Sequence, residues 1–306
     1  MGVKDQVSPK DYQYRSFQIK KKTSGSRHIV APKKQLRRVQ SIIFESILEN
    51  VEPSEFAHGF RKGYSIVSNA KSHLNSEIIY NIDLKNFFTS IKIDKVIDVF
   101  ESIGYSKSIS LLLAKLGTIT PRYYSKDNRM WVIYVNRFPH LPQGATTSPI
   151  LSNLVCIDFD KGINEIAKKY NFRFTRYADD IIFSSSVSKK IPKEFRSEIF
   201  QFIRSYGFRV NLKKERYSRN FKKRIVTGII VHKEQLTLPR SWIRNLRAAL
   251  HQLRFFYSRL QFAETTYMLK NIEGRCSYAM MVNKEKYAHF YYDLQYLKNF
   301  KLKNKP

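Results

Sequence analysis

Residues 174–183 read FTRYADDIIF and place two neighbouring aspartates, Asp179 and Asp180, between apolar and aromatic side chains. Such flanks predict two strands of a buried sheet joined by a turn, with the aspartates at the tip of the hairpin. Asp is a common turn former, and an acidic turn by itself implies no chemistry. In a buried sheet, however, adjacent carboxylates repel each other, and one takes up a proton unless a cation compensates it. A bound divalent cation is the compensation that this pair favours.

A third carboxylate stands in IYNIDLKNFF (79–88), where Asp83 ends an apolar run that predicts a strand. Asp83 could simply cap a following helix. A strand-end aspartate and a hairpin pair are also what a two-metal site needs from adjacent strands. Two Mg²⁺ ions held by a few carboxylates activate the attacking hydroxyl and stabilise the leaving group in phosphoryl transfer. The sequence therefore predicts a site for two Mg²⁺ ions at Asp83, Asp179 and Asp180.

The whole chain is strongly basic. Its 306 residues include 55 Lys and Arg against 25 Asp and Glu, which gives a net charge of +30. Such a charge attracts polyanions, and the interleaved 19 tyrosines and 22 phenylalanines favour a nucleic acid, whose bases stack on aromatic rings. A membrane partner is disfavoured because the basic residues spread along the whole chain and no apolar run approaches the ~18 residues of a membrane span.

The two cysteines, Cys156 and Cys276, form no CxxC pair and have no spacing typical of zinc ligands. Reduced thiols in a protein core are the better interpretation, and they are typical of a cytosolic protein. The first residues contain no apolar core of a secretory signal. We therefore expect a cytoplasmic location.

Hydrophobic periodicity predicts strands and helices in the order of an α+β fold, with an antiparallel sheet whose helices pack on one face. From Pro239 onward the pattern is helical and very basic. The expected strands span residues 14–21, 27–32, 78–88, 132–136, 172–186 (with an internal turn), 208–211 and 224–231. The expected helices span residues 36–51, 65–75, 94–105, 106–118, 150–170 and 192–207.

Three motifs in chain order resemble a reverse transcriptase: Asp83–Phe88 (DLKNFF), Leu141–Gly144 (LPQG) and Tyr177–Asp180 (YADD). Each motif alone is weak, because a match of four letters arises by chance in many proteins. The ordered set is specific. RHIVAPKKQLRRVQ (27–40) and HGFRKGYS (58–65) are also similar to the fingers of bacterial members.

Two further signatures point to one branch of that family. Asn69, Ala70 and His73 match an Asn-Ala-x-x-His signature, and residues 226–228 match a Val-Thr-Gly signature, both of retron reverse transcriptases. The resemblance covers roughly residues 14–255. It implies a right-hand polymerase whose expected divisions are an N-terminal segment and fingers at 1–76, a palm at 77–232 with interposed fingers helices at about 104–137, and a helical, basic thumb at 233–306.

The resemblance also implies roles for single residues. Asp83 and Asp179 would ligate the metals with Asp180 alongside, and the Leu84 carbonyl would complete the nucleotide-side ion. The residues implied at the dNTP are Arg27, Lys22, Phe88, Gln143, Gly144 and Lys214, with Lys213 as the alternative proton donor. The residues implied at the primer and RNA are Asn69, His73, Val226, Thr227, Gly228, Arg240, Arg244 and Arg247.

Each of these roles has a simpler alternative. Phe88 would act as a steric gate against a ribose 2′-OH, or it is ordinary core. Arg27 and Lys22 would grip the triphosphate, or they are solvated charges. Thr227 is equally well explained by strand packing. The pair Asn69 and His73 shares one helix face and is usually a structural contact. The thumb arginines are a solvated face or a grip on an RNA stem.

As a retron enzyme, the protein would copy part of a cognate structured noncoding RNA into DNA. The resemblance implies priming from a guanosine 2′-OH, a branched RNA–DNA product (msDNA), and antiphage defence with an effector protein in a bacterial cytoplasm. Two alternatives stay open. The chain could be another prokaryotic reverse transcriptase, of the group II intron or another defence type, or a catalytically inactive RNA-binding scaffold.

Overall fold

The computed structural model describes residues 13–20, 25–120, 122–127, 130–135, 138–188, 190–219, 224–256 and 262–303. At its centre is a four-stranded antiparallel sheet with the strand order β6-β7-β3-β8. Its strands are β3 (Ile78–Asp83), β6 (Arg173–Tyr177), β7 (Asp180–Ser185) and β8 (Arg216–Arg219).

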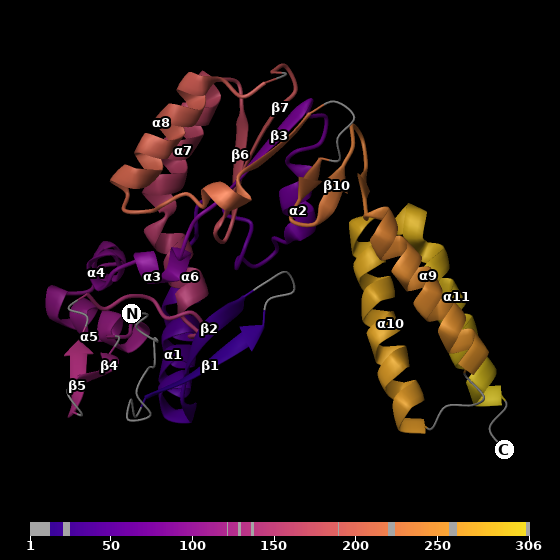
Figure 1. Cartoon of the computed structure of the whole chain (residues 1–306), viewed down its shortest axis with the longest axis horizontal. Coiled ribbons are helices and arrows are strands. Elements are labelled where there is room, and N and C mark those ends of the chain that lie inside the picture. The colour runs from indigo at the N-terminus through magenta and orange to yellow at the C-terminus, as the bar shows by residue number, and fades with distance from the viewer. Residues whose placement is uncertain are drawn as a thin grey trace.

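Two helices cover one face of this sheet. They are α7 (Ile157–Lys169) and α8 (Lys193–Ser205), which lie side by side in Figure 1. Because side chains alternate along a strand, every second residue of β3 points into this layer, namely Ile78, Tyr80 and Ile82. The same helix layer holds the larger of the protein's buried cores.

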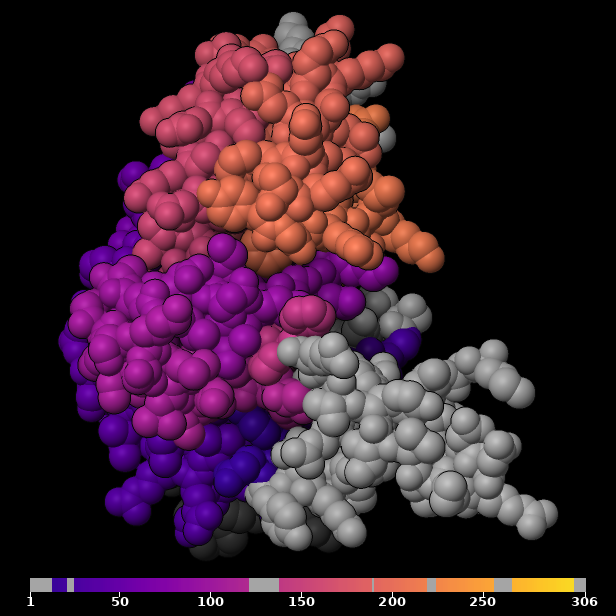
Figure 2. All heavy atoms as spheres, turned by 90° about the vertical axis from the view of Figure 1, so that its left-hand side faces the viewer, coloured from indigo at the N-terminus to yellow at the C-terminus, as the bar shows by residue number. Residues whose placement is uncertain are grey.

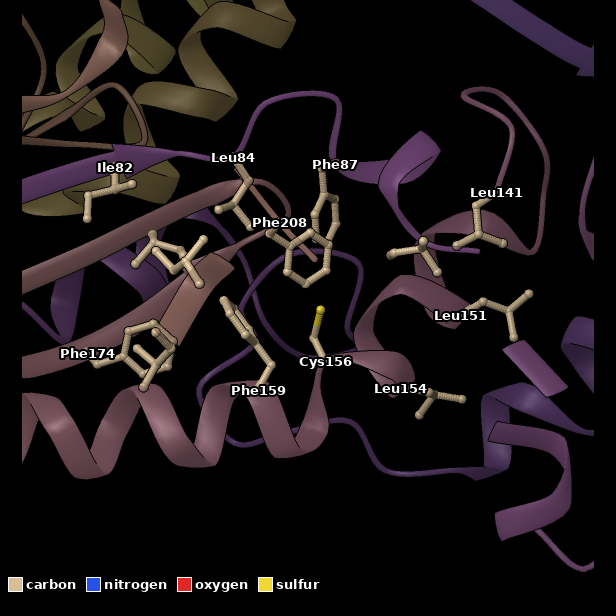
Figure 3. Close-up of a cluster of buried hydrophobic side chains, with 14 of the residues drawn as sticks. Ile82, Leu84, Phe87, Leu141, Leu151, Leu154, Cys156, Phe159, Phe174 and Phe208 are labelled. Atoms are coloured by element: carbon tan, nitrogen blue, oxygen red, sulfur yellow. The ribbon is translucent and has the colours of Figure 1, made fainter. Parts of the chain in front are cut away.

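Aromatic rings fill the part of this core that lies below the end of β3. Figure 3 shows Phe87, Phe208 and Phe159 meeting beside Leu84. The ring centroids of Phe87 and Phe208 are 5.5 Å apart, and those of Phe159 and Phe208 are 5.2 Å apart. Aromatic rings at this spacing stabilise a core by more than their buried area alone, so the end of β3 rests on tightly packed side chains.

The opposite face of the sheet carries the intervening side chains, including Ile79 and Ile182, and packs on a second core. This core joins α2 (Ile66–Lys71) and a three-stranded sheet to the C-terminal helices. Figure 1 shows those helices (orange to yellow) as a bundle beside β10. The remaining elements of this layer are β9 (Ile225–Val226), β10 (Ile229–Val231), β11 (Leu236–Thr237), α9 (Arg240–Phe256), α10 (Phe262–Val282) and α11 (Lys284–Lys303). None of the helices that the structure describes is both long enough and apolar enough to cross a membrane.

The N-terminal and middle elements lie at the end of the sheet where β3 stops (Figure 1). On the face that Figure 2 shows, the segment after α8 (orange) rests on the region of α3 to α5 (purple). The backbone amide of Lys85 donates to the carbonyl of Arg209 at 2.7 Å across this contact. The N-terminal and middle elements are β1 (Tyr14–Lys20), β2 (Ser26–Pro32), α1 (Lys34–Ser46), η1 (Leu48–Asn50), α3 (Phe87–Ser90), α4 (Ile93–Ser102), α5 (Lys107–Gly117), β4 (Arg122–Asp127), β5 (Met130–Val135) and α6 (Ser148–Val155). The segment after α8 contains the short helix η2 (Leu212–Lys214).

Several elements differ from those expected. The single helix predicted at 150–170 is broken at Cys156, whose φ of −90° and ψ of 9° are not helical. Almost all of α6 is buried, whereas α7 buries one stripe, so the two segments follow different directions. The strand predicted at 208–211 was wrong, because Val210 makes only a single bridge, to Leu84. The expected strand at 224–231 is a hairpin, β9 and β10, with a turn at 227–228. The boundaries predicted near residues 76 and 232 stay predictions.

Candidate active site

The register of the central sheet brings the predicted carboxylates together. Asp83 lies directly opposite Asp180 in the pairing of β3 with β7. The amide of Leu84 donates to the carbonyl of Asp179 at 2.9 Å. By strand alternation, Asp83 shares the face of Ile79, away from α7 and α8. The acids therefore stand at one end of two paired strands, on the side of the C-terminal helices.

A two-residue turn forms the tip of the hairpin. Tyr177 pairs with Asp180, and Ala178 between them has a φ of +56°, in the left-handed region that residues with a Cβ seldom adopt. Gly59 lies against this turn, and a Cβ on Gly59 would come within 2.9 Å of the Ala178 amide nitrogen. The histidine-glycine-phenylalanine stretch at 58–60 therefore packs directly over the turn. This close contact explains why its middle residue is glycine.

Burial and neighbouring carboxylates raise the pKa values of the two hairpin acids. Burial first, and then the charges of Asp179 and Asp83, raise the pKa of Asp180 to about 6, although its outer edge is exposed. Burial and the Asp83 charge also raise the pKa of Asp179, while Lys214 and Arg27 lower it. This is the electrostatic state expected of carboxylates that a divalent cation would stabilise.

Asp83 already contacts a cation of the protein. Lys214 Nζ donates to Asp83 Oδ1 at 2.5 Å, and Asn211 Nδ2 donates to Oδ2 at 3.0 Å. The bond to Asp83 raises the pKa of Lys214. In the described residues no three acid, histidine or cysteine side chains are grouped closely enough to enclose a metal. The oxygen donors nevertheless fit Mg²⁺, and the ammonium shows that Asp83 accepts a cation in this position. An ion that bound to Oδ1 of Asp83 would compete with Lys214 for this oxygen.

Of the expected nucleotide-side residues, Arg27 acts on the hairpin acids, whereas Gln143 and Gly144 contact its strand, β2. Arg27 lies on β2, exposed, and close enough to lower the pKa of Asp179. The Gln143 carbonyl accepts from the amide of Val30 on that strand at 2.9 Å. Gly144 has a φ of +130°, and a Cβ there would meet Ile29 at 2.8 Å, so its close approach is to β2. Lys22 lies outside the described residues.

The comparison with known proteins decides the family. Residues 19–252 match the family model described as reverse transcriptase (RNA-dependent DNA polymerase). The chain belongs to the reverse transcriptase family. It is thus an RNA-directed DNA polymerase, and the ordered motif set that resembled this family is confirmed.

The curated relatives of this reverse transcriptase are retron enzymes. The chain is 32% identical to the retron Ec86 reverse transcriptase of Escherichia coli over 277 residues, covering 90% of this chain and 78% of that protein. It is 34% identical to the retron Mx162 enzyme of Myxococcus xanthus and 30% identical to the retron Mx65 enzyme. The matches cover 78% and 89% of this chain but only 52% and 62% of those two proteins. It is a retron reverse transcriptase.

Solved structures agree on the fold of this reverse transcriptase. A telomerase from Candida albicans superposes with a TM-score of 0.53 at 10% identity, covering 95% of this chain and 65% of that one. The apo telomerase of Candida tropicalis gives 0.53 at 13% identity, covering 89% and 53%. At such identities the likeness concerns the fold alone, and it confirms the predicted α+β polymerase fold.

The expected steric gate of the reverse transcriptase, Phe88, lies five residues beyond Asp83, on α3. Phe87 is buried, whereas Phe88 is partly exposed and lies 6.2 Å from the ring of Phe60. We expect Phe88→Ala to raise the incorporation of ribonucleotides relative to deoxynucleotides at least about tenfold, because the ring no longer meets the 2′-OH. Primer extension with matched dNTP and rNTP pairs measures this ratio. Phe100→Ala, which opens the core beneath α4, is the control, and unchanged discrimination by Phe88→Ala would refute the gate.

The raised pKa of Asp180 predicts a pH-dependent stability. A carboxyl whose folded pKa is raised contributes stability below its unfolded pKa, and this contribution is lost as pH rises toward about 6. Asp180→Asn should therefore raise the Tm of the metal-free protein most above pH 6, and the gain should shrink toward pH 4. Thermal unfolding in the presence of a chelator from pH 4 to 8 measures it. A gain that is equal at all pH values would contradict the pKa shift.

Two residues expected to contact RNA lie inside the reverse transcriptase. Asn69 and His73 have no exposed surface. His73 bonds to Thr175 and Ser184 at 2.7 Å through its two ring nitrogens, and Thr175 donates to Asn69 Oδ1 at 2.6 Å. Burial lowers the pKa of His73 to about 3, so the ring is neutral. A direct RNA contact by these side chains is therefore corrected: Asn69, on α2, and His73, in the turn that follows α2, join this segment to β6 and β7 because both side chains face the sheet.

Of the six other expected RNA-side residues, five are partly or fully exposed and one is buried. Thr227 and Gly228 form the β9–β10 turn with φ of 46° and 86°, and Thr227 Oγ1 donates to the Ile66 carbonyl at 3.1 Å. Val226 is fully buried, so its packing role is structural. Arg240, Arg244 and Arg247 are exposed on α9. Their binding to RNA stays a prediction.

Proposed function

We propose that this retron reverse transcriptase copies part of a cognate structured RNA into DNA with two Mg²⁺ ions at Asp83, Asp179 and Asp180. The observation that carries the proposal is the direct pairing of Asp83 with Asp180 across β3 and β7. Three carboxylates at one strand end, of which the two on the hairpin have raised pKa values, offer oxygen ligands to divalent cations. When bound, the ions would supply activation of the attacking hydroxyl and stabilisation of the leaving group.

The chain's own residues would bind and orient the substrates. The Leu84 carbonyl would add an oxygen on the nucleotide side, and Phe88 would exclude the ribose 2′-OH. Arg27 would hold the triphosphate. Lys214 contacts Asp83 at 2.5 Å and, once displaced from it, would be placed to give a proton to the leaving pyrophosphate. This favours Lys214 over Lys213, which makes no bond to Asp83.

We further propose that synthesis starts from a guanosine 2′-OH of the bound RNA and yields a branched RNA–DNA molecule. Such a complex would act in antiphage defence with an effector protein. The retron relatives support this proposal, and the exposed arginines of α9 supply a cationic face for the RNA.

The test is to express the full chain together with the DNA that flanks its gene, to purify the protein, and to sequence the nucleic acid bound to it. We expect one RNA species with a short DNA joined to it, and removal of the link by a 2′,5′-debranching enzyme. Linear DNA copies would favour another type of prokaryotic reverse transcriptase. RNA without any DNA would favour a binding scaffold.

A further inference from the structure

A buried ion pair lies directly behind the hairpin that carries the two aspartates. Arg176 is fully buried, and its Nε and Nη2 donate to the two carboxylate oxygens of Asp160 on α7 at 2.7 and 2.8 Å. Asp160 is fully buried as well. Because side chains alternate along β6, Arg176 points into the helix layer while its neighbour Tyr177 does not. The sequence analysis did not single out either member of the pair.

The third nitrogen of the guanidinium reaches the turn itself. Arg176 Nη1 donates to Asn153 Oδ1 on α6 at 3.0 Å and to the carbonyl of Ala178 at 3.3 Å. Asn153 Nδ2 in turn donates to the carbonyl of Gly59 at 2.8 Å. The Arg176 side chain therefore links α6, α7 and the turn. Asn153 extends this hydrogen-bond network to residues 58–60, which pack over the turn.

The backbone of Arg176 is held at the same point. Its amide donates to the carbonyl of Phe56, and its carbonyl accepts from the amide of His58, both at 2.8 Å. The next residue but one, Ala178, has the positive φ that turns the chain toward Asp179. The carbonyl bonded by Arg176 belongs to the peptide that enters Asp179, so its orientation sets where that carboxylate points.

Packing alone does not explain an arginine in this position. A buried ion pair commonly stabilises a fold no more than an apolar pair of similar volume. An apolar pair could fill the same space between β6 and α7, but it has no donor for the Ala178 carbonyl. A lysine could neutralise Asp160, but one ammonium cannot reproduce the planar fork that serves Asp160, Asn153 and Ala178 together.

We propose that Arg176, oriented by Asp160 and Asn153, is a positioning residue that fixes the turn at Ala178 so that Asp179 and Asp180 meet Asp83 in the geometry that the reaction requires. This inference rests on the proposed two-cation reaction. Arg176 does not touch substrate, and it acts only through the direction of the hairpin carboxylates.

The test compares Arg176→Lys with the double variant Arg176→Met/Asp160→Leu. Both keep the buried charge balanced, so at least one should fold, and thermal unfolding and circular dichroism check this. In a folded variant we expect kcat for DNA synthesis to fall about a hundredfold, because a displacement on the order of 1 Å at the reacting groups suffices for that loss. The KM for the RNA primer–template should change by less than about threefold, because the RNA-binding surface is untouched. Lys169→Met, which breaks an exposed pair with Glu198 on the same helix layer, is the matched control and should leave kcat unchanged.

A second readout does not depend on turnover. Mn²⁺ binding to the enzyme–RNA complex without nucleotide, followed by electron paramagnetic resonance, should weaken in the folded Arg176 variant. Absence of Mn²⁺ binding in the wild type, with full activity in Asp179→Asn, would overturn the two-cation reaction itself. Normal Mn²⁺ binding in the wild type, with the same affinity and the same kcat in a folded Arg176 variant, would overturn only the positioning role.

Discussion

Asp179→Asn is expected to lower the rate of cDNA synthesis by about a thousandfold or more while leaving RNA affinity nearly unchanged. The asparagine has almost the shape of the aspartate, so the hairpin keeps its turn and its pairing with β3. It lacks the charge that a cation needs, and it removes one of the repulsions that raise the pKa of Asp180. Primer extension on the cognate RNA measures the rate, and a binding titration at the same salt concentration measures the affinity.

The control for this substitution is Asp158→Asn. Asp158 stands on α7 with an exposed side chain and pairs with Lys161, so the change in net charge is the same without any change at the hairpin. We expect the control to polymerise like the wild type. Equal activity of Asp179→Asn and the wild type would refute the assignment of the hairpin acids, and a parallel loss of RNA affinity would mean that the substitution had disturbed the fold.

RNA affinity is expected to fall by about three to five orders of magnitude between 50 and 200 mM salt if the protein neutralises six to ten phosphates. The net charge of +30 makes such a number of contacts reasonable. Within the described residues, Arg240, Arg244 and Arg247 are exposed on α9 and offer three of them. Replacing each by glutamine should weaken binding and reduce the slope of log K against log salt by about one.

Measuring RNA affinity at several salt concentrations distinguishes basic side chains that contact RNA phosphates from those that are only solvated. Binding titrations at five or more salt concentrations give the slope for the wild type and for each arginine variant. Lys169→Gln removes the same charge from an exposed ion pair with Glu198, away from α9, and should keep the wild-type slope. A flat response of the wild type would show that the basic surface serves another purpose, and unchanged slopes in the arginine variants would place the RNA elsewhere.

The sequence patterns pointed to the carboxylates of the candidate site but not to the buried residues that hold them in place. Asp83, Asp179 and Asp180 could be grouped because the strand period and the hairpin pattern are local signals, and in the structure Asp83 lies opposite Asp180 while the Leu84 amide bonds to the Asp179 carbonyl. Their catalytic role stays a prediction. Arg176 and Asp160 could not be paired, because nothing in a sequence shows that a charge is buried or which helix it meets. Asn153 on α6 and Asp160 on α7, the two partners of Arg176, both fell inside one expected helix, because the break at Cys156 was not predicted.

The same limit explains the correction at Asn69 and His73. α2 ends at Lys71, before His73. A spacing of four predicts that both residues share one helix face, but it does not say whether that face meets solvent or a sheet. The structure shows that it meets β6 and β7, where His73 bonds to Thr175 and Ser184. Gly144 is similar, because the need for a small residue was predictable while its neighbour, β2, was not.

The bond between Lys214 and Asp83 gives the polymerase an internal counter-ion, because the lysine ammonium neutralises the carboxylate. The acid group at the end of β3 has a counter-ion before any substrate arrives. If a magnesium nucleotide binds at Asp83, the ion would replace the ammonium at this carboxylate. We infer that the released lysine would then stand close to the incoming phosphates, so that binding of the metal and release of the proposed proton donor would be coupled.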